Sequence, residues 1–289
     1  MKILVIGNGF LAVPIIENLE LEGHQIYVFS RSIKSGISSP QIQGDIFEVD
    51  KVEDVLRKGF DVVINTAWIT SLGKYQSDVI NIKYGDFALK LAKKSSESGV
   101  KHFIGFGSCA EYGIRFSPSV AGVTPLSSTN LYSEQKIKAF HSTKDLLMET
   151  ATRFSWVRIF QPYGLNQDSN RLIPYLINCL KNEKKIEIND QNSILDWVTT
   201  RDIASATSWV IKHSLPIELD VGTGHGYTNL EILKHLEDLL GKCKNLDILG
   251  KPSLSRPQAV LGRQSPLLTS GWRPKDSLAT GLDWLVSNE

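Results

Sequence analysis

The stretch "KILVIGNGFLA", residues 2–12, decides the fold. Its first five residues, four of them apolar, predict a short strand that is buried on both faces, as in a parallel sheet. The strand runs directly into the pattern G-x-G-x-x-A, whose glycines allow a tight turn and a close approach of phosphate to the backbone. A glycine turn that serves packing alone is the alternative. The residues expected to hold a dinucleotide here are Gly7, Gly9, Phe10 and Leu11.

Similar short apolar runs alternate with amphipathic segments further along the chain. The expected strands lie at 2–6, 25–29, 61–65, 102–106 and 155–160. The helical patterns between them lie near 10–21, 77–98 and 131–149. Strand–helix alternation at this spacing predicts an α/β fold of the Rossmann type, a doubly wound parallel sheet with right-handed crossovers.

The pattern loosens after about residue 165. Helices are expected near 171–182, 228–240 and 276–287, with one more strand within 217–224. We therefore expect a dinucleotide-binding Rossmann domain over residues 1–165 and a smaller C-terminal α/β substrate lobe over 166–289. Parts of 195–224 are expected to return to the core.

Composition excludes several classes of protein. The 289 residues are 42% hydrophobic and carry a formal net charge of +1, without a basic stripe for nucleic acid. No apolar run reaches the roughly 18 residues of a membrane span. The first strand leaves no room for a signal peptide, so we expect a cytoplasmic protein. Three widely spaced cysteines and scattered histidines predict no metal site.

The end of the second strand bears on the choice of cofactor. An NAD site usually places an acid there, which holds the ribose 2′-hydroxyl. This chain has Ser30 and Arg31 instead, which favours a 2′-phosphate and hence NADP, with NAD as the alternative. Asp45, in "GDIF", is expected to accept a hydrogen bond from the adenine amino group, or else to serve only its own turn.

A tyrosine and a lysine stand four residues apart in "NLYSEQKIKAF", residues 130–140. On a helix these positions share one face, so the ammonium of Lys136 comes near the phenol of Tyr132. A nearby positive charge lowers the pKa of a tyrosine. The pair is therefore a candidate for proton transfer near neutral pH.

Together with "DVVINTAW", "GFGSCAEYG", "RIFQPYG" and "DVGTG", these motifs make the chain resemble the extended short-chain dehydrogenase/reductases. This is the NAD-dependent epimerase/dehydratase superfamily, many of whose members act on nucleotide-linked sugars. The resemblance implies that Ser108 is the catalytic hydroxyl, Tyr132 the general acid/base and Lys136 its partner, which also contributes to cofactor binding. It further implies that Ala67 and Tyr163 line the dinucleotide, with packing as the alternative for both.

Three departures from the family pattern limit the chemistry. Dehydratases carry an Asp-Glu pair directly after the serine or threonine, but Cys109 and Ala110 stand here, so dehydration by that route is not expected. Leu195 replaces an arginine that many relatives use on the substrate diphosphate. Arg256 matches a second such arginine, and Trp197 is expected to stack on the substrate unless it is buried under the lobe.

These observations predict an NADP(H)-dependent oxidoreductase that reduces a keto group on a nucleotide-linked sugar, such as a 4-keto-6-deoxy sugar. The first alternative is an NAD-dependent nucleotide-sugar epimerase, and the second is a non-catalytic dinucleotide-sensing protein. The resemblance also implies a homodimer paired through the helices at 77–98 and 131–149. Their apolar residues include Leu89, Leu91, Ile137 and Phe140.

Overall fold

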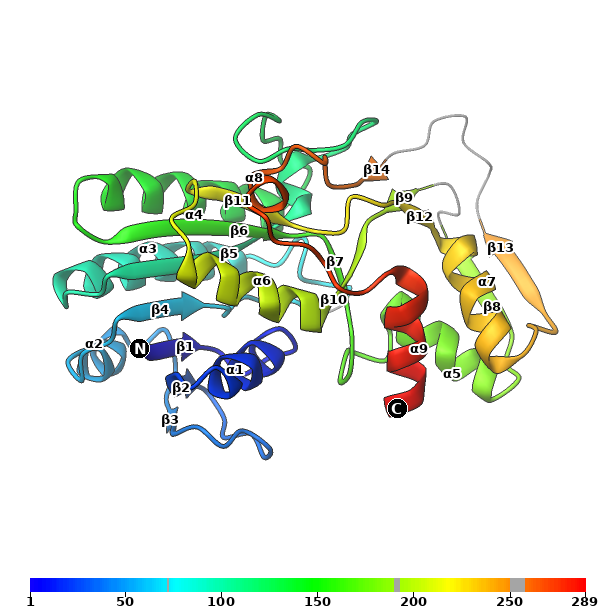
Figure 1. The fold of residues 1–289 in the computed structure, drawn as a ribbon, viewed down its shortest axis with the longest axis horizontal. Coiled ribbons are helices and arrows are strands. Elements are labelled where there is room, and N and C mark those ends of the chain that lie inside the picture. The colour runs from blue at the N-terminus through cyan, green and yellow to red at the C-terminus, as the bar shows by residue number, and fades with distance from the viewer. Residues whose placement is uncertain (72, 190–192, 250–257) are drawn as a thin grey trace.

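A parallel sheet of seven strands forms the centre of the computed structural model, which describes residues 1–71, 73–189, 193–249 and 258–289 (Figure 1). The strands follow the order β11-β6-β5-β4-β1-β2-β3, and every neighbouring pair is parallel. They are β1 (Lys2–Ile6), β2 (Gln25–Ser30), β3 (Gln41–Gln43), β4 (Val62–Asn65), β5 (His102–Ser108), β6 (Arg153–Ile159) and β11 (Glu218–Val221).

Strand β1 lies at the middle of this sheet because its side chains are apolar on both faces. Ile3 and Val5 contribute to one hydrophobic cluster, while Leu4 and Ile6 contribute to the other. The chain proceeds from β1 to β2 and β3 on one side and from β4 to β5 and β6 on the other. The order of strands therefore reverses between β1 and β4, and ligands of such sheets bind outside the carboxyl ends of the strands at that point.

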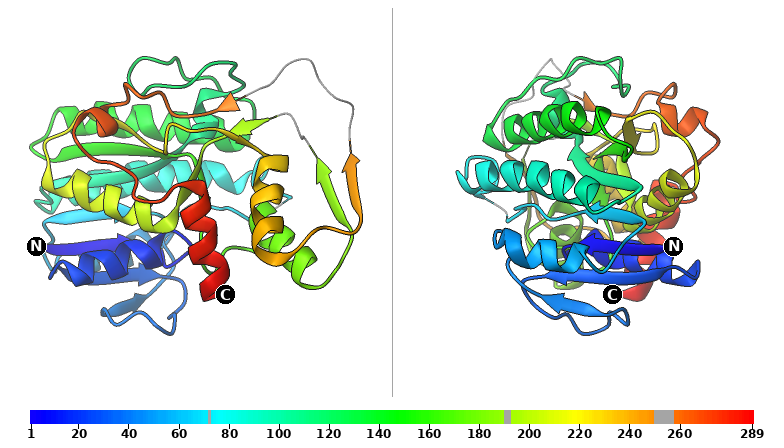
Figure 2. Two further views of the ribbon diagram at one scale, coloured as in Figure 1. Left: turned by 45° about the vertical axis from the view of Figure 1, so that its right-hand side comes forward. Right: turned by 90° about the vertical axis from the view of Figure 1, so that its left-hand side faces the viewer.

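Helices cover both faces of the sheet (Figure 2). The hydrophobic clusters divide in the same way, one on each face. The helices on one face are α1 (Ala12–Leu21) and α6 (Thr200–Lys212), and those on the other are α2 (Val49–Leu56), α3 (Ile80–Glu97) and α4 (Leu131–Met148).

A smaller group of elements lies beyond the carboxyl ends of the strands, at the right of Figure 1, around a third hydrophobic cluster. Its helices are α5 (Leu172–Lys181), α7 (Asn229–Leu240) and α9 (Leu278–Asn288). Its short strands pair as β8 (Ile186–Asn189) with β13 (Leu246–Leu249), and as β9 (Ile194–Leu195) with both β12 (Tyr227–Thr228) and β14 (Gln258–Ala259). Strand β7 (Gln161–Tyr163) pairs with β10 (Trp197–Thr199). Elsewhere in the described chain there are two short helices, η1 (Cys109–Tyr112) after β5 and α8 (Pro266–Thr269) before α9.

The predicted fold class is confirmed, as are the five predicted strands of the Rossmann core. Within 195–224, β11 pairs with β6 and α6 packs against α1, so this segment does return to the main sheet. The division at residue 165 stays a prediction. The sequence patterns did not predict α2, α6 or the short strands β3, β7, β8, β9, β10, β12, β13 and β14. A strand of two to four residues is too short to show a periodic pattern. Helices α2 and α6 each bury one apolar face, so their apolar spacing was the available signal.

Candidate active site

The turn after β1 has the geometry of a phosphate-binding loop. Gly7 has φ of +103°, and a Cβ added to it would come within 2.8 Å of Thr66 Oγ1. Gly9 has no heavy atom within 4 Å of such a Cβ, so the space above it is open. Helix α1 begins at Ala12, and its N-terminus places a partial positive charge at this point. The Ala12 and Val13 N–H groups both donate to the Gly9 carbonyl. The close contact with Thr66 explains why residue 7 is a glycine, but no such contact explains Gly9. The open space above Gly9 fits a loop that receives a pyrophosphate.

Phe10 and Leu11 complete this turn, and both are partly buried. Leu11 packs against the hydrophobic cluster on the α1 face of the sheet. Ala67 lies next to Gly7, since the Cβ added at Gly7 would be 3.5 Å from the Ala67 nitrogen. The predicted dinucleotide residues of β1 and β4 therefore gather at one edge of the sheet.

Arg31 and Asp45 lie at the outer end of this edge. Arg31 is exposed, and its carbonyl accepts a hydrogen bond from Gln43 Nε2 at 3.1 Å. Asp45 Oδ1 accepts one from the backbone N–H of Phe47 at 3.0 Å, which fits the turn alternative for this residue. Burial raises the pKa of Tyr84. The charge of Arg31 lowers this pKa and that of Asp45 raises it, so the two charged groups act on the same phenol.

Ser108, Tyr132 and Lys136 come together at the end of β5. The Asn130 side chain accepts a hydrogen bond from Ser133 N–H at 3.0 Å and caps α4, which fixes Tyr132 in its first turn. The Ser108 side chain lies near enough to the Tyr132 phenol to lower the pKa of that phenol. Lys136, one turn later, donates from Nζ to the Phe106 carbonyl at 2.5 Å.

The pKa of Tyr132 departs from the direction expected from the sequence. Burial raises the pKa of the phenol, and the neighbouring Ser108 side chain opposes that shift. Lys136 Nζ lies 5.8 Å from the centre of the Tyr132 ring and binds Phe106, so it does not offset the burial. Burial also lowers the pKa of Lys136 itself to about 7.

Aromatic rings surround this pair, and the sequence patterns did not predict them. Trp68 lies below the ammonium, with its ring centre 3.9 Å from Lys136 Nζ. Tyr75 packs edge-on against Tyr132 with 5.0 Å between ring centres. Trp68 directly follows Ala67 in the motif "DVVINTAW", so its position was the one available signal. An indole face stabilises a nearby cation, which compensates in part for the burial of Lys136.

Glu111 is a second residue that the sequence patterns missed. It is fully buried in η1, and its carboxylate accepts a hydrogen bond from the Ser108 backbone N–H at 2.8 Å. The neighbouring Cys109 is also buried, and burial raises the pKa of its thiol to about 12. A thiol with so high a pKa is not an activated nucleophile.

The other predicted residues lie elsewhere. Tyr163 is 1% exposed within the third hydrophobic cluster, and its hydroxyl packs against Gly281 of α9, which fits the packing alternative. Trp197 belongs to the same cluster and is 7% exposed, with no hydrogen-bond partner for Nε1 in the described part of the chain. Arg256 lies outside the described residues.

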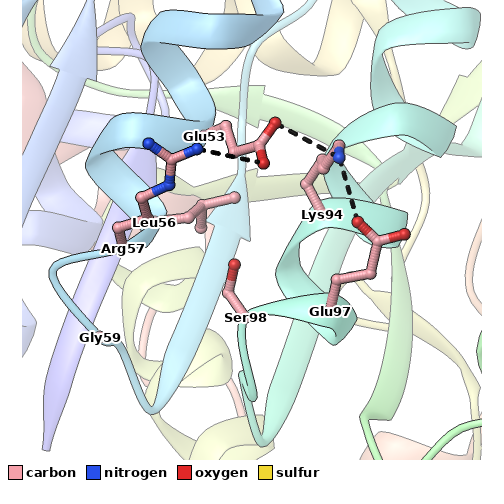
Figure 3. Close-up of a pocket in the computed structure, with 7 residues that line it drawn as sticks. All are labelled: Glu53, Leu56, Arg57, Gly59, Lys94, Glu97 and Ser98. Carbon is pink, nitrogen blue, oxygen red and sulfur yellow. Dashed lines mark ion pairs between the residues drawn. The ribbon is translucent and has the colours of Figure 1, made fainter.

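A cavity of about 320 Å³ lies at the opposite end of the sheet, between α2 and the end of α3 (Figure 3). Its charged residues pair with one another. Glu53 binds Lys94 at 3.3 Å and Arg57 at 3.6 Å, and Lys94 also binds Glu97 at 3.1 Å. The charged side chains of this cavity are therefore already paired with one another.

Two further searches of the described ranges gave negative findings. No three His, Cys, Asp or Glu residues among 1–71, 73–189, 193–249 and 258–289 could hold a metal ion together. None of the helices in the part of the chain that the structure describes is long and apolar enough to cross a membrane.

The two glycines of the loop give a paired prediction. Gly9→Ala should leave the free energy of unfolding within about 0.5 kcal/mol of the wild type, since nothing lies near the added methyl. It should weaken dinucleotide binding tenfold or more, about 1.4 kcal/mol. Gly7→Ala should destabilise the fold by about 1–3 kcal/mol, because an L residue is strained at this φ. Urea unfolding and calorimetric titration with NAD measure both. Unchanged NAD affinity in Gly9→Ala would contradict the assignment of the loop.

Comparison with known proteins places this geometry in a family. The sequence model of the NAD dependent epimerase/dehydratase family matches residues 3–222. The UDP-glucose 4-epimerase of Lactobacillus helveticus is 26% identical over 100% of this chain and 98% of its own. The solved Thermus thermophilus UDP-glucose 4-epimerase in complex with NAD superposes with a TM-score of 0.86 at 23% identity, covering 99% of this chain and 98% of that one.

A solved UDP-glucose 4-epimerase from Thermotoga maritima with UDP-glucose gives a TM-score of 0.85 at 20% identity, covering 99% of this chain and 98% of that one. These likenesses confirm the fold, and the family match covers most of the chain. The protein belongs to the NAD dependent epimerase/dehydratase family, a family of enzymes of the short-chain dehydrogenase/reductase type.

Proposed function

We propose that the protein is an NAD-dependent epimerase that acts on a sugar linked to a nucleoside diphosphate. The observation that carries the proposal is the meeting of Ser108, Tyr132 and Lys136 at the end of β5, beside the open glycine loop. Relatives named as 4-epimerases support this function over the NADPH-dependent reductase predicted first from the sequence. The order of those two predictions is therefore reversed.

The three side chains suit a reaction in which a sugar hydroxyl is oxidised to a keto group, and this keto group is then reduced at the same carbon. Bound NAD would accept the hydride and return it, and would add a positive charge near Tyr132 while oxidised. The Tyr132 phenol exchanges the proton of the sugar hydroxyl. Ser108, which lies beside that phenol, donates to the sugar oxygen. Substrate and product have the same oxidation state, so no second reductant is needed.

Lys136 holds the geometry of this proton exchange. Its ammonium is anchored to the Phe106 carbonyl and lies over Trp68, so it stays on the strand end beside Ser108. Since burial has already lowered the pKa of Lys136 to about 7, its charge depends on the groups around it.

Fewer observations bear on the residues that bind the nucleotide part of the substrate and on the oligomeric state. Trp197 and Arg256 remain proposed substrate residues, and the neighbours solved with UDP-sugars support a nucleotide-linked substrate. The homodimer also stays a prediction. Leu91 and Phe140 are each 1% exposed and pack in the core, so they serve the fold of one chain.

The proposal predicts that UDP-glucose or a related nucleotide sugar is converted to its 4-epimer without net production of NADH. Tyr132→Phe should lower the rate about 10²–10⁴-fold, because it removes the proton-transfer group. Tyr75→Phe is the matched control, since that ring packs on Tyr132 and its loss of oxygen should leave the rate nearly unchanged. Coupled product detection measures the rate. A fully active Tyr132→Phe variant would sink the catalytic assignment.

The NADPH-dependent reductase remains the second candidate, because no carboxylate follows Ser30 at the end of β2. If Arg31 binds a 2′-phosphate, the charge-assisted hydrogen bond contributes about 1.5–3 kcal/mol, roughly a ten- to hundredfold preference for NADPH. The epimerase proposal predicts instead that NAD binds at least as tightly as NADP. Under it, Arg31→Ala changes NAD affinity little. Calorimetric titration with NAD and with NADP distinguishes the epimerase from the reductase. A strong preference for NADP that is lost in Arg31→Ala would make the reductase the first candidate again.

A further inference from the structure

Glu111 is the fully buried carboxylate directly behind Ser108. It lies in η1, which follows β5, and its side chain is 0% exposed. Three N–H groups converge on it. Ser108 N–H donates at 2.8 Å, Trp156 Nε1 at 3.1 and 3.3 Å to the two oxygens, and Arg158 Nε at 2.7 Å.

The same strand end carries Lys136. The ammonium binds the carbonyl of Phe106, two residues before Ser108. Between them, Gly107 lies so close to Glu111 that an added Cβ would come within 2.4 Å of its Oε1. Trp156, which donates to Glu111, also faces Lys136 with its ring centre 5.9 Å from Nζ. One carboxylate therefore contacts both the backbone of Ser108 and the indole next to Lys136.

Stability alone gives a poor reason for a charge at this position. Arg158 pairs with Glu111 and, through Nη1, with Glu218 at 2.9 Å. Removing charges from water is expensive, and well-packed apolar residues often replace a buried ion pair without loss of stability. An apolar pair would fill the same space, but it would bind neither the Ser108 N–H nor an ammonium.

We propose that Glu111 is a positioning residue of the reaction, whose carboxylate fixes the Ser108 backbone at the end of β5 and keeps the Lys136 ammonium charged. The inference rests on the proposed function of Ser108, Tyr132 and Lys136. Glu111 touches none of the reacting atoms and acts through these neighbours.

The charges around Lys136 support the second half of this role. Burial lowers the pKa of Lys136, and the charge of Glu111 opposes that shift. Tyr132 faces the ammonium from α4, and Trp68 and Trp156 face it from the β4 loop and β6. Glu111 pairs with Arg158, and its charge also acts on Tyr112, Asp220, Cys109 and Tyr132, whereas Glu218 pairs with Arg158.

Asp220 is the other deeply buried carboxyl near this network. It accepts a hydrogen bond from the Tyr112 hydroxyl at 2.8 Å, and burial raises its pKa to about 7. The Glu218 side chain is 20% exposed and forms an ion pair with Arg158, whereas the Glu111 carboxylate accepts from the Ser108 backbone N–H.

Glu111→Gln and Glu218→Gln make a matched pair, since each removes one negative charge from Arg158 and only the first touches Ser108. Glu111→Gln should lower kcat about ten- to a hundredfold, the range that one charge-assisted hydrogen bond supplies. KM should stay close to the wild type. The alkaline limb of the pH–rate profile should move to lower pH, because a Lys136 without this carboxylate loses its proton earlier. Glu218→Gln should change neither quantity, and Glu111→Asp, which keeps the charge, should keep the wild-type alkaline limb.

An NMR titration of the Lys136 Nζ reports its charge without any turnover, so it separates this inference from the proposed function. Its pKa should fall in Glu111→Gln and stay unchanged in Glu218→Gln.

If Glu111→Gln does not fold, Glu111→Gln combined with Arg158→Met removes both buried charges, and this folded double variant should still show the low kcat and the lower pKa. A wild-type kcat and an unshifted Lys136 pKa in Glu111→Gln would overturn the proposal. Equal effects of Glu218→Gln would overturn it as well. An inactive wild type with the expected shift would contradict only the proposed function.

Discussion

The ammonium of Lys136 donates to the carbonyl of Phe106, and the arrangement of the site depends on this hydrogen bond. It joins helix α4 to the end of β5, the strand that carries Ser108. Tyr132 is one turn earlier on the same helix, and its phenol lies near the Ser108 side chain. The interaction costs desolvation of a cation. The Trp68 ring beneath the ammonium and the charge of Glu111 offset part of that cost.

Much of this architecture could be predicted from local patterns. The run "KILVI" and the glycines after it predicted a buried central strand and a dinucleotide turn, because both depend on residues close in sequence. The spacing of Tyr132 and Lys136 predicted a shared helix face for the same reason, and Asn130 provides the cap that starts that helix. The structure adds that the space above Gly9 is open, which is the stronger reason for a glycine there.

The rest depends on contacts between distant parts of the chain. The sequence around Glu111 does not show that this charged residue is buried. Its burial depends on Arg158 and Trp156, which lie on a strand more than forty residues later. Tyr163 was expected at the cofactor from its motif, yet it packs under Gly281, near the C-terminus. The pKa of Tyr132 was expected to fall, because the spacing of two residues does not reveal how deeply both are buried.

The central claim is that one site removes a hydride from a sugar carbon and returns it to the same carbon. The most direct test uses a UDP-hexose that carries deuterium at C4 and follows the label by mass spectrometry and NMR. The account predicts that the 4-epimer keeps the deuterium at C4, with none in free dinucleotide. Deuterium that accumulates in free reduced dinucleotide, with a keto sugar as the product, would contradict it and would identify a net oxidoreductase.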